Sequence, residues 1–281
     1  MNRIIKTSSV DQLEYEVLEF VPTQIEQIVL IVHGMQDYKE RYIEFAGTLE
    51  NNNCLVLIPD LRGHGINPSV VRENNFIYQL HDLDDLINKY YNKDVTLFGH
   101  SMGSLLVRAY LKRYPRKIKR AILSGSPSYD KLIPIVRQLL KMTKGLSFTR
   151  NYKSRLLHKL VIESFNQKTN YDWLSYNQKN VDDYINSPYC GVYFTNQQYQ
   201  DLFELMMDVN DTYKRLMTNA EVTLLTGADD PVAKNVDEVE SLLNDWGFRT
   251  NQIVYPNSRH EILFDNEKEM VIKDILAILG K

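Results

Sequence analysis

A Gly-x-Ser-x-Gly pentapeptide at residues 99–103 is the feature of this chain with the clearest chemistry. The β-branched and aromatic run at residues 95–98 leads directly into it, and apolar residues at helical spacing follow it. This order of strand, tight turn and helix is typical of a nucleophile elbow, in which a serine stands exposed on a strained backbone. Both neighbours of the turn must be glycine, because a Cβ there would meet the adjacent strand or helix. The same pentapeptide also occurs in purely structural turns, so a catalytic Ser101 needs a base, an acid and an oxyanion hole elsewhere in the chain.

An acid and a base follow Ser101 in the required order. Asp229 and Asp230 come after an apolar run and precede a proline that fixes the turn. Asp230 is the predicted acid that orients a histidine, whereas Asp229 is expected to be a solvated turn residue; an ordinary Asp-Pro turn is the alternative. His260 is the only histidine after this pair, and its imidazole can accept the serine proton near neutral pH. Triads built around a nucleophile elbow have the order serine, acid, histidine.

An oxyanion hole needs two backbone N–H groups directed at the developing negative charge. The residue after the nucleophile, Met102, is the first predicted donor. The second is Met35, in the His-Gly-Met loop that follows the apolar run at residues 28–32. Gly34 allows the backbone of this loop to approach the substrate closely. His33, at the end of the same strand, is predicted to make structural hydrogen bonds rather than to act as the base.

The remaining polar motifs receive structural interpretations. Arg62 and His64 lie in a glycine-containing loop after the next predicted strand and are expected to brace that loop. His81, His100 and His158 are likewise expected to be structural. The sequence holds no His-x-x-x-His pair and no phosphate-cradling glycine loop, so it predicts neither a metal nor a cofactor.

Composition places the chain among soluble globular proteins. Its 281 residues, 43% hydrophobic and 25% charged, suit one large domain or a core with an inserted subdomain. A net charge of −3 is the opposite of the basic footprint that nucleic acid requires. No secretory signal is expected, and no apolar run reaches the roughly 18 residues that span a bilayer. The two cysteines, Cys54 and Cys190, fit a cytoplasmic protein, although a single disulfide is the alternative.

The elements that position these residues alternate between strand and helix. Six short apolar runs rich in branched residues are predicted to be buried parallel strands, at residues 28–32, 55–58, 95–98, 121–123, 222–226 and 252–255. Helical patterns are found at residues 41–50, 80–90, 105–113 and 270–279. Two leading segments, 4–7 and 14–20, alternate as an antiparallel edge hairpin does. The predicted fold class is therefore α/β, with a mostly parallel central sheet flanked by helices.

The alternation of predicted strands and helices stops between residues 127 and 218, where only helical patterns are found. We expect a helical lid (cap) at residues 127–218, inserted between two parts of one core, 1–126 and 219–281. The lid would cover the carboxyl ends of the strands. Gly34, Phe194, Met206 and Met207 are the predicted substrate-binding residues. Several apolar lid positions either line an acyl-chain pocket or only hold the lid helices together: Leu139, Leu140, Met142, Phe194, Phe203, Met206 and Met207.

One predicted lid helix carries four basic residues: Lys131, Arg137, Lys141 and Lys144. They would suit transient contact with an anionic membrane surface, and ordinary solvated charge is the alternative. The sequence carries no signal for the oligomeric state.

Five segments together resemble the α/β-hydrolase superfamily, in particular its branch of monoacylglycerol lipases, lysophospholipases and serine aminopeptidase-type hydrolases. They span nearly all of the predicted core and begin at His33, Asp60, Gly99, Gly227 and Arg259. In the insertion, segments 172–175 and 187–191 resemble the lid of bacterial lysophospholipase-like members. There are two departures: Ser104 replaces a glycine that often follows the elbow, and Asp37-Tyr38 stands where many relatives carry Glu-His.

The residues and the resemblance imply an enzyme that cleaves a carboxylic ester, a monoacylglycerol or a lysophospholipid, through an acyl-enzyme. Ser101 would attack the acyl carbon, with His260 as base and Asp230 as its partner. The N–H groups of Met35 and Met102 would hold the oxyanion. One alternative is a non-catalytic ligand-binding protein on the same fold. The other is a serine aminopeptidase-type amide hydrolase, in which the substrate amine would bind a lid carboxylate: Glu163, Asp182 or Glu204.

Overall fold

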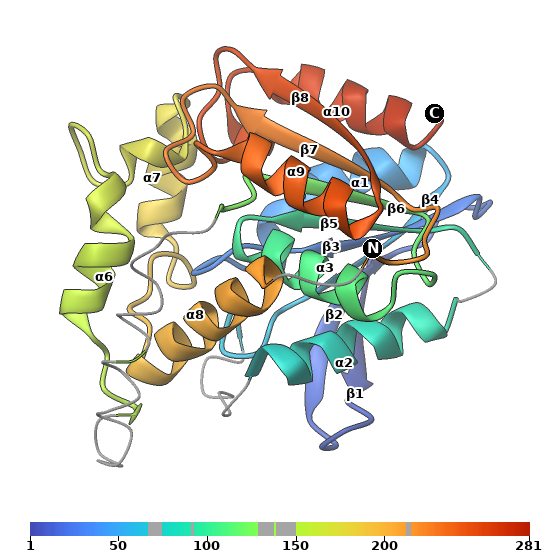
Figure 1. Cartoon of the computed structure of the whole chain (residues 1–281), viewed down its shortest axis with the longest axis horizontal. Coiled ribbons are helices and arrows are strands. Elements are labelled where there is room, and N and C mark those ends of the chain that lie inside the picture. The colour runs from blue at the N-terminus through green and yellow to red at the C-terminus, as the bar shows by residue number, and fades with distance from the viewer. Residues whose placement is uncertain (67–74, 91–92, 129–137, 139–149, 212–214) are drawn as a thin grey trace.

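The structure is a computed structural model that describes residues 1–66, 75–90, 93–128, 138, 150–211 and 215–281. An eight-stranded sheet crosses the molecule, and helices cover both of its faces (Figure 1). The strand order is β1-β2-β4-β3-β5-β6-β7-β8. The six strands from β4 to β8 in this order are parallel, whereas β1 and β2 are antiparallel to their neighbours. The predicted α/β class with a mostly parallel central sheet is confirmed.

The parallel strands are the branched apolar runs of the sequence. Every residue of β4 and β5 is buried, as expected for strands covered on both faces. The bounds of the parallel strands are β3 Gln27–Val32, β4 Cys54–Pro59, β5 Val95–His100, β6 Arg120–Ser124, β7 Glu221–Gly227 and β8 Arg249–Tyr255. Each one extends its predicted run by no more than a few residues.

The predicted edge hairpin is also present. Strand β1 (Asn2–Thr7) pairs antiparallel with β2 (Glu14–Phe20), with Asn2 opposite Glu19. Exposed and half-buried residues alternate along the last four residues of β1, which lies at the edge of the sheet. Strand β2 is more deeply buried because it also pairs with β4.

Two apolar layers hold the helices against the sheet. Helices α1 (Ile43–Asn51) and α10 (Lys268–Ile278) pack on one face. Helices α2 (Asn75–Asn88), α3 (Met102–Arg113) and α9 (Val236–Trp246) pack on the other. The loops at the carboxyl ends of β3, β5, β7 and β8 therefore emerge at one end of the sheet, between these two layers.

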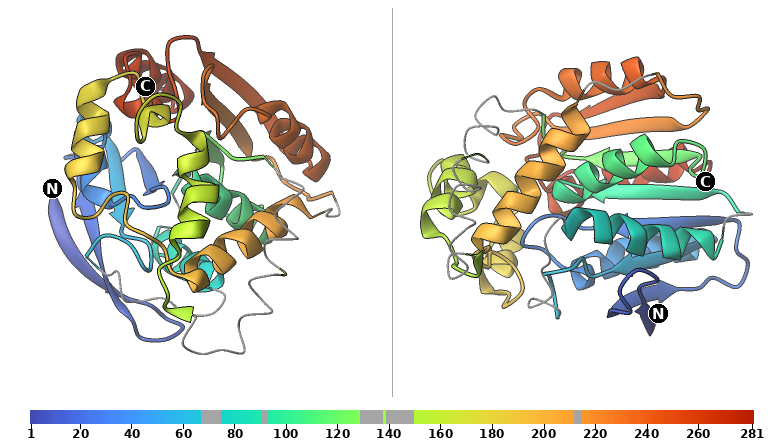
Figure 2. Two further views of the ribbon diagram at one scale, coloured as in Figure 1. Left: turned by 90° about the vertical axis from the view of Figure 1, so that its left-hand side faces the viewer. Right: turned by 60° about the horizontal axis from the view of Figure 1, so that its bottom comes forward.

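The described part of the predicted lid lies at that end of the sheet (Figures 1 and 2). It contains α6 (Arg155–Val161), α7 (Gln178–Asn186) and α8 (Asn196–Asn210). Helix α8 shares the apolar layer of α2 and α3, so it is packed into the core as well as covering the sheet. None of the described helices is both long and apolar enough to cross a membrane.

Some predicted lid residues lie outside the described part of the chain. They are Lys131, Arg137, Leu139, Leu140, Lys141, Met142 and Lys144. The lid boundaries at residues 127 and 218 stay a prediction.

Candidate active site

Ser101 stands on a strained turn between β5 and α3. Its φ of 51° and ψ of −118° lie outside the regions that residues with a side chain prefer. A Cβ at Gly99 would lie 2.7 Å from the Gly103 carbonyl oxygen, and a Cβ at Gly103 would lie 2.1 Å from that of Val32. Backbone atoms cannot make way as a flexible side chain can, so both positions require glycine. This is the requirement predicted from the sequence.

Ser104, the departure from the family pattern, supports this turn. Its hydroxyl donates to the Ser101 carbonyl oxygen at 2.5 Å, and its oxygen lies 2.9 Å from Ser126 Oγ, whose hydroxyl can donate to it. The Ser101 N–H donates to the Ser124 carbonyl oxygen at 2.9 Å, which ties the turn to β6. The serine therefore adds hydrogen bonds to the elbow where a glycine would have none.

Asp230 and His260 meet although they come from different loops. Asp230 follows β7, His260 follows β8, and His260 Nδ1 lies 2.9 Å from Asp230 Oδ2. The other carboxylate oxygen accepts the N–H groups of Val232 at 2.8 Å and Ala233 at 3.2 Å. Burial opposes ionisation of Asp230, but His260 and these two N–H donors outweigh it and lower its pKa. Asp230 is therefore a buried carboxylate that faces one nitrogen of the imidazole.

The His260 ring is enclosed by groups that the sequence did not indicate. Its centroid lies 4.8 Å from that of His100 and 5.2 Å from that of Trp173. Gly125 has a φ of +56°, and a Cβ there would lie 2.9 Å from His260 Cε1 and 3.2 Å from Asp230 Oδ2. Gly125 thus provides the space in which the imidazole and its carboxylate meet. The available signal was a glycine directly after a buried strand.

One cavity of about 730 Å³ is lined both by these loops and by the described part of the predicted lid. Ser101, His260, Gly34, Met35 and Met102 line it at the end of the sheet. Its apolar lining comes largely from the predicted lid, with Leu105 from α3; these residues are Leu105, Leu157, Leu160, Val161, Ile162, Phe165, Leu202, Phe203 and Met206. Within the described residues, no three His, Cys, Asp or Glu side chains gather as a metal site.

Two of the predicted substrate-binding residues do not line this cavity. Phe194 is 2% exposed and packs edge-on against His64, with ring centroids 5.2 Å apart. Met207 packs against the main apolar core instead. Met206 does line the cavity, and the next residue along α8 points about 100° away from it. Gly34 and Met206 therefore line this cavity, whereas Phe194 and Met207 do not, and the substrate-binding role of all four stays a prediction.

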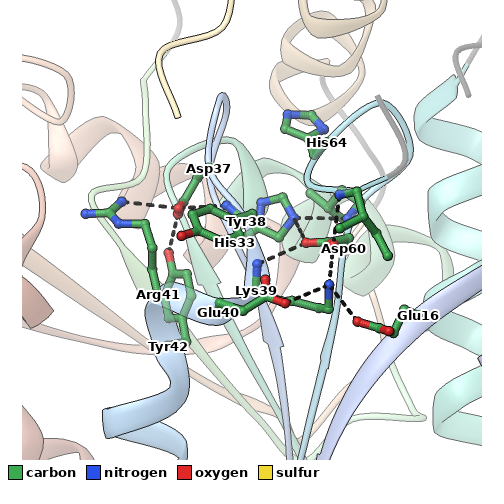
Figure 3. Close-up of polar contacts among 12 residues, drawn as sticks. Glu16, His33, Asp37, Tyr38, Lys39, Glu40, Arg41, Tyr42, Asp60 and His64 are labelled. Atoms are coloured by element: carbon green, nitrogen blue, oxygen red, sulfur yellow. Dashed lines mark hydrogen bonds and ion pairs between the residues drawn. The ribbon is translucent and has the colours of Figure 1, made fainter. Parts of the chain in front are cut away.

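The loop that carries the second predicted oxyanion donor is firmly anchored (Figure 3). Lys39 donates to Asp60 through its backbone N–H at 3.0 Å and through Nζ at 2.5 Å. Its Nζ also lies 3.1 Å from Glu16 on β2. Burial disfavours the charged lysine, but these carboxylates outweigh it and raise its pKa. His33 Nε2 accepts the Leu61 N–H at 3.0 Å, so His33 has the structural hydrogen bonds expected of it.

Arg41 joins this loop to the rest of the site. Its guanidinium donates to both carboxylate oxygens of Glu261, at 2.6 and 2.7 Å. Glu261 directly follows His260 in the chain. The guanidinium also donates to Asp37 at 3.1 Å (Figure 3) and to Asn180 on α7 at 2.9 Å. Burial opposes its charge, but the two carboxylates outweigh it and raise its pKa. We call these four residues the Arg41 junction; it connects the loop after β3, the loop that carries His260, and the cap.

Acid is expected to destabilise the fold through two buried histidines. Burial lowers the pKa of His64 to about 3; burial and the nearby His260 lower that of His100 to about 4. Between these values and the ordinary pKa near 6.5, the unfolded chain binds more protons than the folded one, so stability falls as pH falls. Each histidine should cost about 2 kcal/mol of unfolding free energy between pH 6.5 and pH 5.

Urea unfolding at pH 7.5, 6.5, 5.5 and 5 measures this loss. His64→Gln should remove about half of the pH dependence, whatever its own effect on stability at pH 7.5. An unfolding free energy that stays constant from pH 6.5 to pH 5 in the wild-type protein would contradict the neutral state of these two rings.

Comparison with known proteins gives a consistent family. The sequence profile of the family described as "Serine aminopeptidase, S33" matches residues 23–267. A probable lysophospholipase L2 of Haemophilus influenzae is 27% identical over 139 residues, which are 46% of this chain and 44% of that protein. A monoacylglycerol lipase of Mycolicibacterium smegmatis is 29% identical over 133 residues, 43% of this chain and 45% of that protein. The matched region spans less than half the length of these curated relatives.

Solved structures resemble almost the whole chain. A thermostable carboxyl esterase from Bacillus coagulans superposes with a TM-score of 0.85 at 19% identity, covering 99% of this chain and 97% of that one. A monoacylglycerol lipase from Paleococcus ferrophilus superposes with a TM-score of 0.75 at 21% identity, covering 95% and 98%. At these identities the likeness shows the shared fold.

Proposed function

The chain belongs to the serine aminopeptidase S33 family of α/β-hydrolases, and from this premise we propose that it hydrolyses carboxylic esters of a single acyl chain. Monoacylglycerols and lysophospholipids are the proposed substrate class. One observation carries the proposal: Ser101 and His260 share a cavity with an extended apolar wall. Its volume of about 730 Å³ lies in the roughly 300–1,000 Å³ range of small-molecule sites.

In the proposed mechanism, Ser101 Oγ attacks the acyl carbon while His260 Nε2 takes its proton. Asp230 supports this step because it holds Nδ1 at 2.9 Å and stabilises the imidazolium. The N–H groups of Met35 and Met102 stabilise the oxyanion. His260 then returns the proton to the leaving alcohol, which leaves an ester of Ser101. Water, deprotonated by the same imidazole, hydrolyses this ester and releases the fatty acid.

The lining of the cavity supports ester over peptide substrates. In the aminopeptidase alternative, the substrate amine would bind a carboxylate that is accessible from the cavity. Among the described lining residues, the carboxylates are Asp37 and Glu261, and both accept hydrogen bonds from Arg41. The three lid carboxylates considered for this role do not line the cavity: Glu163, Asp182 and Glu204.

We also propose that the protein works in the cytoplasm. Cys54 and Cys190 are both free and buried, which suits a reducing compartment.

The test is turnover of p-nitrophenyl esters from acetate to palmitate beside aminoacyl p-nitroanilides. We expect ester hydrolysis with an optimum at medium or long acyl chains, because only such chains fill the apolar wall. Hydrolysis of anilides but not of esters would replace the proposal with the aminopeptidase alternative. Activity on acetate alone would contradict the acyl-chain assignment.

A pair of adjacent methionines provides a control for the acyl site. Met206→Trp should shift the optimum to shorter chains, because it fills part of the cavity. Met207→Trp places the same bulk one position further along α8, outside the cavity lining, and should leave the optimum unchanged. Equal shifts in both variants would mean that α8 affects the chain-length preference only through general packing.

A further inference from the structure

The charges that line the active-site cavity are unevenly compensated. Asp37 and Glu261 are 1% and 3% exposed, and both are held by Arg41. Asp37 accepts a further hydrogen bond from the Tyr42 hydroxyl at 2.8 Å, and Glu261 accepts one from the Asn180 amide at 2.7 Å. Lys234 is the remaining Lys, Arg, Asp or Glu among the described lining residues, and it is exposed. The two carboxylates share one guanidinium but are closed to solvent, so the exposed charged side chain among the described lining residues is the positive one of Lys234.

The backbone around Lys234 is fixed relative to the reacting groups. It directly follows Ala233, whose N–H donates to Asp230 Oδ1 at 3.2 Å, and the Val232 N–H donates to the same oxygen at 2.8 Å. Pro231 and Asn235 line the cavity from the same loop. The turn that presents Asp230 to His260 thus also sets the position of the lysine at the cavity. A flexible four-carbon side chain on this fixed backbone can follow a head group without disturbing Asp230.

We propose that Lys234 selects substrates whose alcohol part carries an anionic phosphate. The acyl chain would occupy the apolar wall, the ester would lie at Ser101, and the phosphate would pair with Lys234 Nζ. This inference rests on the proposed ester hydrolysis and narrows its substrate class to anionic lysophospholipids over neutral monoacylglycerols. A positive charge at this position also disfavours a substrate with a free amine.

The test compares two soluble esters that differ only in the phosphate, 1-decanoylglycerol and 1-decanoylglycerol 3-phosphate, below their aggregation concentrations. The measured quantity is the ratio of their kcat/KM values, so that a general loss of activity cancels. Lys234→Met should lower the ratio of phosphate to neutral ester by about two- to fivefold, chiefly through KM, the size expected of one solvent-exposed ion pair. Lys234→Glu should lower it further, and Lys234→Arg should restore it.

Lys273→Met on α10 is the matched control, because Lys273 is exposed and does not line the cavity. Its ratio should equal that of the wild-type enzyme. Raising the salt concentration should reduce the wild-type preference and leave that of Lys234→Met almost unchanged. An unchanged ratio in Lys234→Met and Lys234→Glu would overturn the head-group proposal while leaving ester hydrolysis intact. If the wild-type enzyme hydrolyses neither ester, the proposed function itself fails.

Discussion

Replacement of Ser101 by alanine is expected to lower kcat on the preferred p-nitrophenyl ester by at least about 10³-fold, because a triad acts as a unit. Ser101 lines the cavity at the turn between β5 and α3. Alanine can take the same backbone conformation, because it differs from serine only by the hydroxyl group. The loss should therefore appear in turnover and not in folding. Circular dichroism and the thermal midpoint provide the check on folding.

Ser241→Ala is the control for this experiment, because Ser241 is exposed on α9. It should retain wild-type turnover. Residual activity of Ser101→Ala within tenfold of wild type would exclude Ser101 as the nucleophile. A wild-type protein that also fails to react with a fluorophosphonate probe would favour the non-catalytic alternative.

Asp230→Asn is expected to lower kcat by about 10³–10⁴-fold, the size seen when a triad histidine is held in the wrong tautomer. The N–H groups of Val232 and Ala233 need an acceptor, so the amide oxygen of the new side chain should take the place of Oδ1. Its NH₂ group would then donate to His260 Nδ1. This places the imidazole proton on Nε2, the nitrogen that must accept the proton of Ser101.

The neighbouring carboxylate offers a matched control. Asp229 is exposed and accepts a hydrogen bond from the Tyr176 hydroxyl at 2.6 Å. Asp229→Asn changes the net charge by the same amount one residue away and should keep kcat within about twofold of wild type. Similar losses in Asp229→Asn and Asp230→Asn would show that the local charge matters and not the contact with His260.

Local patterns were sufficient for the sheet and for the pairing of Asp230 with His260. Branched apolar runs predict β3 to β8, because strands buried on both faces have no polar side to alternate with. The ends of helices were less accessible: α2 already includes Asn75, five residues before its predicted start. Helix α9 was not predicted, although Val236, Val239, Leu243 and Trp246 form a buried stripe at helical spacing.

The surroundings of the site could not be read from local patterns. Arg41 and Glu261 are 220 positions apart, and no periodicity links two such residues. Trp173 contacts His260 because the predicted lid folds onto the core, and Gly125 lies beside His260 because β6 neighbours β7 in the sheet. Apolar character alone suggested Phe194 and Met207, and both are packed against apolar groups. It could not tell which apolar faces border the cavity and which border the core.

The Arg41 junction has a consequence for how substrate enters. Helix α7 reaches both core loops through Asn180, which accepts a hydrogen bond from Arg41 and donates one to Glu261, so pulling it away would leave half-buried Arg41 and buried Glu261 with fewer hydrogen-bond partners. Removing the hydrogen-bond partners of buried charged groups costs several kcal/mol. An opening motion with that free-energy cost would be rare. We therefore expect α7 to act as a fixed pivot. Widening of the entrance would come from α6, whose Leu160 is 58% exposed and already borders the cavity.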